Sequence, residues 1–85
     1  MRNEGSSPLP SAMTYYCDDA RHLVCIPYSL ENLHAMADAM SIRRHWFHGD
    51  HYDIPKRRIE EITALCVVVS TRDIVRIIRG EFIGG

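Results

Sequence analysis

The chain has 85 residues, of which 46% are hydrophobic and 25% are charged, and its formal net charge is −1. This length allows one domain with a small core, so we expect self-association into a homo-oligomer. The near-neutral charge argues against a generally cationic nucleic-acid binder, although a local basic patch leaves nucleic acid open as a partner. No apolar run approaches the roughly 18 residues of a membrane span. We therefore expect a cytoplasmic protein without a membrane partner.

The composition of the two ends sets the bounds of the folded unit. Residues 1–12 are rich in glycine, serine and proline and predict a flexible leader. The sequence predicts a single domain over residues 13–80 and a frayed tail over residues 81–85. The cysteines are odd in number, lack a CxxC pair and lie among apolar residues, so we expect buried reduced thiols. They are Cys17, Cys25 and Cys66.

The first two predicted elements are strands. Residues 14–17 (TYYC) are strand formers that stop at Asp18-Asp19, and residues 22–27 (HLVCIP) form a second apolar run. The intervening turn is compatible with a hairpin or with an open connection.

A helix and an extended segment follow. Ser29 is a typical helix cap, and His34 lies on the border of the apolar stripe that follows it. The stripe consists of Leu30, Leu33, Met36, Ala37 and Met40. Residues 42–48 are expected to be extended, with Trp46 as a large anchor, up to the break at Gly49.

A second helix is predicted to begin at Asp53 or Ile54, because Pro55 is favoured in a first helical turn. Its expected apolar face is Ile59, Ile62 and Leu65.

The last predicted elements are a strand and a helix. The β-branched run at residues 66–69 predicts the central buried strand. Ser70 or Thr71 then caps a helix that ends at Gly80. Its expected inward-facing residues are Ile74, Val75, Ile77 and Ile78. The whole pattern predicts a small single-domain α/β layer fold with about three strands, three helices and a partly parallel sheet.

An acidic pair directly follows the first strand. Asp18 and Asp19 stand at the carboxyl end of that strand, where ligands of open α/β sheets bind and where carboxylates could hold a divalent cation. The simpler alternative is local turn chemistry, because aspartate is a common turn residue.

The segment from residue 45 to residue 58 holds most of the remaining polar chemistry. Imidazole and carboxylate groups are the usual ligands of zinc or iron and the usual bases in hydrolysis. The segment provides His45, His48, Asp50, His51 and Asp53. Gly49 and Pro55 oppose one regular helix through all three histidines, so we favour His51 and Asp53, which flank the turn into the second helix.

Three cations at the start of the second predicted helix suggest an anion site. Lys56, Arg57 and Arg58 would oppose the positive end of the helix dipole, and a bound anion would relieve this conflict. A solvated charged face is the alternative. Nearby Trp46 and Phe47 are more typical of a core or an interface than of a base-stacking platform.

Four segments resemble a small bacterial and phage family catalogued as domain of unknown function 4031. They are residues 13–20 (MTYYCDDA), 33–38 (LHAMAD), 44–47 (RHWF) and 51–53 (HYD), in the family's order. The resemblance runs from Met13 to about Arg79, implies a phage or prophage origin in a bacterial host cell, and brings no established activity.

The resemblance also directs attention to particular residues: Asp18, Asp19, His34, Trp46, His51, Tyr52 and Asp53. Two departures from the family pattern matter, and the first puts metal binding in doubt if the histidine of the relatives is a metal ligand. Many relatives carry a Cys-His pair near the second strand, whereas here Cys25 is followed by Ile26. Many also have a longer stretch between the tryptophan and the His-Tyr-Asp motif.

The leading functional hypothesis is a phage-type accessory protein whose polar cleft binds a phosphate-bearing ligand, with a divalent metal as an option. The expected catalytic residues are Asp18, Asp19, His51 and Asp53, and the expected metal ligands are Asp18, Asp19 and His51. The expected ligand-binding residues are His34, Tyr52, Lys56, Arg57 and Arg58. If the protein is an enzyme, metal-assisted phosphoester hydrolysis fits these groups best.

The alternative is a non-catalytic protein that binds or inhibits a host protein. Trp46, Phe47 and the arginines would form its interface, because aromatic and arginine side chains dominate binding energy at such surfaces.

Overall fold

The fold is described from a computed structural model, which covers residues 13–82. The predicted leader, residues 1–12, and the last three residues of the predicted tail lie outside the described residues.

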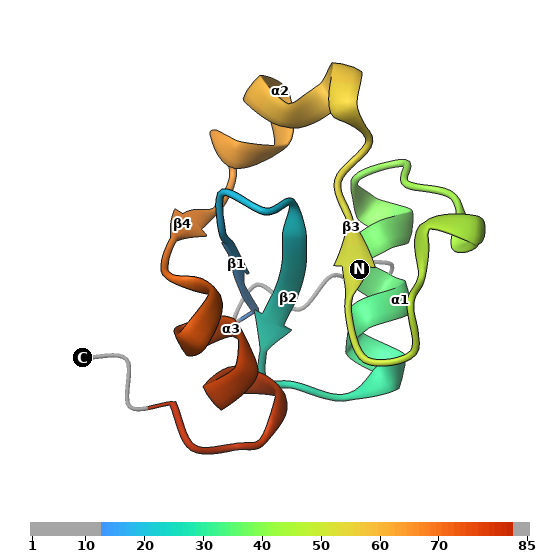
Figure 1. The fold of residues 1–85 in the computed structure, drawn as a ribbon. Helices are drawn as coiled ribbons and strands as arrows, with labels where there is room; N and C mark the ends of the chain where they lie inside the picture. The colour runs from blue at the N-terminus through green and yellow to red at the C-terminus, as the bar shows by residue number, and fades with distance from the viewer. Residues whose placement is uncertain (1–12, 83–85) are drawn as a thin grey trace, which may run out of the picture.

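Four strands form one mixed sheet in the order β3-β2-β1-β4 (Figure 1). β1 (Thr14–Cys17) and β2 (His22–Ile26) form the antiparallel hairpin that was one of the two predicted connections. β3 (Tyr52–Asp53) adds antiparallel to β2, and β4 (Val67–Val68) adds parallel to β1. The predicted α/β class with a partly parallel sheet is confirmed, with four strands in place of three.

Within residues 13–82, three α-helices and two short 3₁₀ helices accompany the sheet. The α-helices are α1 (Leu30–Ala39), α2 (Ile59–Thr63) and α3 (Thr71–Ile78). The 3₁₀ helices are η2 (Arg44–Trp46) and η3 (Lys56–Arg58). Figure 1 shows α1 behind the sheet, α3 in front of it and α2 beyond one end.

The core lies on both faces of β2. Leu23, Val24 and Cys25 have no exposed surface, and successive strand side chains point to opposite faces. Both faces must therefore be covered, and β2 contacts both α1 and α3.

The predicted helix caps are confirmed. The Ser29 side chain accepts a hydrogen bond from the Asn32 N–H, and the Ser70 side chain accepts one from the Asp73 N–H. The α1 stripe is buried except for Leu30, which is exposed in the first turn. In α3, Ile74 and Ile77 are buried as predicted, whereas Val75 is exposed.

The predicted start of the second helix is wrong. Tyr52 and Asp53 pair with β2 as a strand, and α2 begins only at Ile59. Of its predicted apolar face, only Ile62 is buried, and Leu65 lies beyond the end of the helix. Helical periodicity could not place Leu65 on this face, because α2 ends at Thr63.

The predicted central strand at residues 66–69 is also misplaced. Its β-branched residues do form a strand, but β4 is an edge strand of two residues whose side chains are exposed. Strand propensity favours a pleated conformation without deciding the position in the sheet, and β1 and β2 take the centre.

Two further segments differ from expectation. Residues 42–48 are not extended throughout, because residues 44–46 form the 3₁₀ helix η2. At the other end, Phe82 packs edge-to-face against Tyr16 with ring centres 5.4 Å apart, so at least this residue of the predicted frayed tail joins the domain.

Candidate functional site

The carboxylate of Asp18 is fully buried directly after β1. Its Oδ1 accepts hydrogen bonds from the Ala20 N–H at 3.0 Å and the His22 N–H at 2.9 Å. Its Oδ2 accepts one from Thr71 Oγ1 at 2.7 Å and lies 2.8 Å from His22 Nδ1. Burial by itself would raise the pKa of this carboxyl, but the hydrogen bonds from Thr71 and His22 outweigh burial and lower the pKa. The ionised carboxylate thus joins β1, β2 and α3.

A second set of imidazole and carboxylate groups continues from His22. The rings of His22 and His51 meet edge-to-face with centres 4.8 Å apart. His51 Nδ1 lies 2.7 Å from Asp50 Oδ1, and its Nε2 lies 3.3 Å from Asp53 Oδ1. His48 Nε2 lies 3.0 Å from Asp53 Oδ2.

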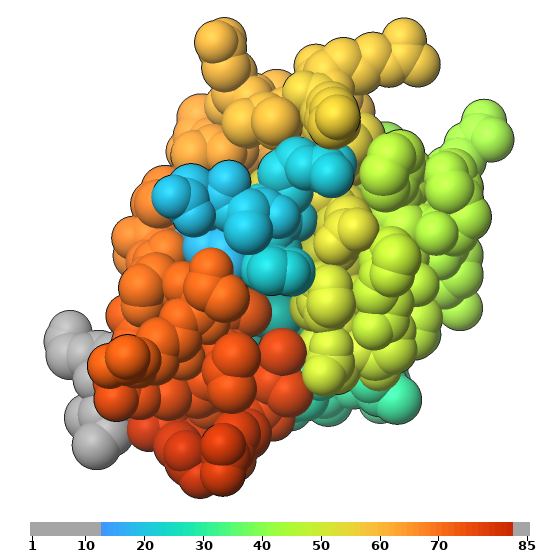
Figure 2. Space-filling model, in the orientation of Figure 1, coloured from blue at the N-terminus to red at the C-terminus, as the bar shows by residue number. Residues whose placement is uncertain are grey.

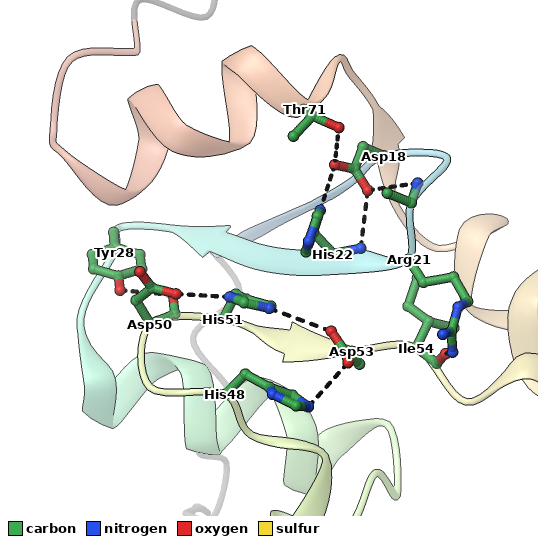
Figure 3. A network of polar contacts seen from close by, with 11 residues as sticks. Asp18, Arg21, His22, Tyr28, His48, Asp50, His51, Asp53, Ile54 and Thr71 are labelled. Atoms are coloured by element: carbon green, nitrogen blue, oxygen red, sulfur yellow. Dashed lines mark hydrogen bonds and ion pairs between the residues drawn. The ribbon is translucent and has the colours of Figure 1, made fainter.

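We call the two sets together the His–Asp network. Figure 3 shows Asp18, His22 and Thr71 between β2 and the start of α3, and the other members along β3 and the loop before it. It consists of Asp18, His22, His48, Asp50, His51, Asp53 and Thr71. Each of its carboxylates has an imidazole partner.

Strand register explains which predicted site residues meet. His22 pairs with Asp53, so these side chains share the α3 face of the sheet, together with His51. Tyr52 alternates with them and points toward α1, where its hydroxyl lies 2.7 Å from His34 Nδ1. Burial raises the pKa of Tyr52, so the hydroxyl is neutral. His34 and Tyr52, both predicted to bind ligand, therefore lie on the opposite face of the sheet from the network.

The predicted metal ligands gather only in part. Asp18 and His51 meet through His22, but Asp19 is exposed and makes no hydrogen bond to its neighbours in residues 13–82. Within this described range, no group of three or more His, Cys, Asp or Glu side chains could hold a metal ion. The proposed metal site at Asp18, Asp19 and His51 finds no support in these side chains.

The network borders a small hollow of about 190 Å³ beside α3. His22, His51, Ile74 and Ile78 contribute to its walls, and no lysine or arginine of the described part of the chain lines it. Imidazole–carboxylate pairs can act as general bases. However, this hollow offers no cation to hold a phosphate.

Sequence reasoning missed His22, which was assigned only to the start of a strand. Its signal was its position four residues after Asp18 across a short turn. A tight hairpin brings the residues flanking its turn together, and here Cys17 stands opposite Leu23.

The adjacent cations Lys56, Arg57 and Arg58 differ in their partners. Arg58 donates to the carbonyl oxygens of Met40 at 2.6 Å and Ser41 at 3.0 Å, at the end of α1. It also forms an ion pair with Glu61 at 2.7 Å, which lowers the pKa of that carboxyl. The Arg58 guanidinium is thus already occupied. Lys56 and Arg57 are exposed and form no ion pair with any carboxylate among residues 13–82.

Lys56 and Arg57 border a surface depression that we call the basic groove. One part, of about 540 Å³, is lined by Arg21, Trp46, Pro55, Lys56 and Arg57. A second part, of about 420 Å³, shares Trp46, Pro55 and Arg57 with the first. Its other wall includes Arg43, His45 and Arg58. Among residues 13–82, no carboxylate lines either part. In Figure 2, long side chains of the yellow segment that supplies this groove project into solvent.

Arg21 is held at the groove by unusual backbone geometry. Its φ of 71° lies in the left-handed region, which costs a non-glycine residue about 1 kcal/mol. Its carbonyl accepts from the Ile54 N–H at 2.9 Å, and its guanidinium donates to the Ile54 carbonyl at 3.0 Å. These bonds fix a strained arginine beside Pro55 and the groove.

Of the two predicted interface aromatics, only Trp46 lines the groove, and Phe47 packs against other side chains of the domain. Trp46 is half-buried and lines both parts of the groove. Phe47 is half-buried between the rings of His34 and Tyr52, at centre distances of 4.8 Å and 5.3 Å. Phe47 therefore packs within the domain.

The cysteines are all free. Cys17 and Cys25 are buried as predicted, and Cys66 is half-buried. Burial raises the pKa of Cys25 to about 11 and that of Cys66 to about 12, so both thiols are protonated at neutral pH and poorly suited to act as nucleophiles.

Comparison with known proteins places this geometry in a family. The model of a family described as "Protein of unknown function (DUF4031)" matches residues 13–81, which is most of the chain. The chain belongs to the DUF4031 family. No curated protein and no solved structure matches it.

The DUF4031 match spans both the His–Asp network and the basic groove, and the family description assigns neither of them an activity. In residues 13–82 no helix is long and apolar enough to cross a membrane.

Proposed function

We propose that this DUF4031 protein binds a phosphate-bearing ligand in the basic groove. The observation that carries the proposal is a hollow lined by Arg21, Lys56 and Arg57, with no carboxylate from residues 13–82 in its lining. Guanidinium groups present paired N–H donors that match phosphate oxygens, and a lysine ammonium adds a point charge.

The contrast with Arg58 supports this choice. Arg58 is satisfied by two carbonyl oxygens and Glu61, whereas neighbouring Arg57 lacks a carboxylate partner among the described residues. The predicted anion site at a helix N-terminus is not formed, because Lys56–Arg58 form a 3₁₀ helix ahead of the short helix α2. The proposal therefore rests on the lining of the groove.

The proposal does not need a metal ion, because arginine and lysine supply the charge that offsets the phosphate. Catalysis by Asp18, Asp19, His51 and Asp53 is not part of it. The accessory role in a phage or prophage remains a prediction from family resemblance.

Fluorescence of Trp46 offers a direct test, because it is the only tryptophan and lines the groove. Titration with inorganic pyrophosphate at low salt should change the emission saturably. Arg57→Glu should weaken binding at least about tenfold, equivalent to about 1.4 kcal/mol. Arg79→Glu is the matched control, because Arg79 is exposed at the end of α3 and lies outside the groove lining. Equal affinities of the two variants, or no binding by the wild type, would overturn the proposal.

A second candidate function is protein–protein contact through the edge strand β4. Leu65, Val67 and Val68 are 58%, 48% and 58% exposed, and only one side of β4 is paired within the sheet. Exposed apolar edge strands are sites of strand pairing between chains. The strand β4 is a different surface from the predicted interface, which consists of Trp46, Phe47 and the arginines. Light scattering should then show concentration-dependent self-association that Val68→Lys abolishes, and a monomer at all concentrations would exclude a second copy as the partner.

A further inference from the structure

We infer that the ligand of the basic groove is single-stranded nucleic acid, with a base stacked on Trp46. This inference rests on the proposed phosphate-binding function and adds to it the class of ligand.

Cations lie in both of the parts of the groove that Trp46 lines. Trp46 lines both parts of the groove, with Arg21 and Lys56 in one part and Arg43 in the other. Arg57 lines both. A single phosphate would occupy only one part. Cations in both parts fit a ligand that carries phosphates on either side of a group lying against Trp46.

The Trp46 indole is suited to stack on a base. Trp46 is half-buried and packs against the core, so the ring is anchored while part of it faces the groove. The His45 ring lies 5.1 Å from it at an angle of 37° and lines the same groove. Aromatic rings interleaved with cations along a groove are the usual platform for unpaired bases, because every base has a face that can stack.

Stacking on Trp46 favours a single strand over a duplex as the ligand. The bases of a duplex are stacked on one another, so an indole cannot reach their faces without opening the helix. The groove is formed by the turn at Arg21, by η2 and by the segment from Pro55 to Arg57. A duplex would therefore leave the Trp46 ring without a base to stack on.

Fluorescence anisotropy of labelled oligomers tests the inference. The probes are a single-stranded oligothymidylate of about eight nucleotides, an abasic oligomer with the same number of phosphates, and a duplex of equal length. The oligothymidylate should bind at least about tenfold more tightly than either of the others. Trp46→Leu should reduce its affinity to that of the abasic oligomer and leave abasic binding unchanged.

The outcomes distinguish the inference from the function on which it rests. Equal binding of oligothymidylate and abasic oligomer, lost in Arg57→Glu, would overturn base stacking and leave phosphate binding intact. Tighter binding of the duplex would also overturn the inference. No binding of any probe, including pyrophosphate, would remove both.

A surface variant covers the case in which Trp46→Leu fails to fold. Arg43 is exposed, and no ion pair involving it occurs within residues 13–82. Arg43→Glu should therefore fold normally and weaken oligothymidylate binding by a larger factor than it weakens pyrophosphate binding, because pyrophosphate can bind in the Lys56 part of the groove. Equal oligothymidylate binding by Arg43→Glu and the wild type would contradict a ligand that spans both parts.

Discussion

The His–Asp network and the basic groove are formed by residues close together in the chain, but they differ in whether their charged side chains have partners within the protein. In the network, Asp18 accepts four hydrogen bonds and every carboxylate has an imidazole partner. In the groove, Lys56 and Arg57 have no carboxylate partner among the described residues. Polar groups that are satisfied internally hold a fold together, whereas charges left open to solvent are available to a ligand.

The difference arises within a few residues. Asp53 belongs to the network and Lys56 to the groove, with Ile54 and Pro55 between them. Ile54 is buried and bonds to Arg21, which fixes the chain at the boundary. We therefore expect substitutions in the network to change stability and substitutions in the groove to change ligand affinity.

The largest effect should come from Asp18. Asp18→Ala removes a buried carboxylate and leaves the partners on β2 and α3 unsatisfied, which should lower the free energy of unfolding by about 2–4 kcal/mol. Asp19→Ala is the matched control, because this exposed neighbour should change stability by less than about 0.5 kcal/mol. Urea denaturation measures both. Similar small effects would show that the network does not hold the fold.

Adjacent arginines sharpen the comparison further. Arg58→Ala should destabilise the protein by about 1–2 kcal/mol, because the carbonyls of Met40 and Ser41 lose their charged donor. Arg57→Ala should leave stability unchanged within about 0.5 kcal/mol. Pyrophosphate titration should reverse this order, with the larger loss of affinity in Arg57→Ala. If both variants lose affinity equally, Arg58 also contributes to the site.

Acid should lower the stability that the Asp18 carboxylate gives to the folded protein. The pKa of Asp18 is lower in the folded protein than in the unfolded chain, so its contribution to stability is present above the ordinary aspartate pKa. That contribution is lost as the pH falls through the lowered folded pKa. The unfolding free energy of the wild type should therefore decrease in this acidic range more steeply than that of Asp18→Asn. Parallel pH profiles would contradict the assignment.

Arg21 should contribute more to ligand affinity than to stability. Arg21→Gly relieves the left-handed backbone but removes the bond to the Ile54 carbonyl, so the net change should stay within about 1 kcal/mol. Affinity for pyrophosphate should nevertheless fall, because one cation of the groove is lost. Unchanged affinity would place Arg21 outside the ligand site.

Local signals in the sequence were sufficient for part of the fold. The β1–β2 hairpin and the caps at Ser29 and Ser70 depend on neighbouring residues, and the sequence predicted them correctly, with the hairpin as one of two options. The strands β3 and β4 have two residues each. Such short strands are stabilised by distant partners, so local propensity could not place them.

The sequence likewise predicted only part of the candidate site. The sequence indicated Asp18, His51 and Asp53 as candidates, but only strand register reveals that His22 connects them. It could not separate Arg57 from Arg58. The carbonyls that occupy Arg58 lie 17 and 18 positions earlier in the chain, at the end of α1.

The most direct test of the comparison is an amide and indole N–H correlation spectrum recorded during titration with inorganic pyrophosphate. We predict that the single indole signal, from Trp46, and the amide signals of Lys56 and Arg57 shift saturably. The amide signals of His51 and Thr71 should stay in place. Shifts centred on His51 and Thr71, with an unmoved indole, would contradict the account and assign the ligand to the His–Asp network instead.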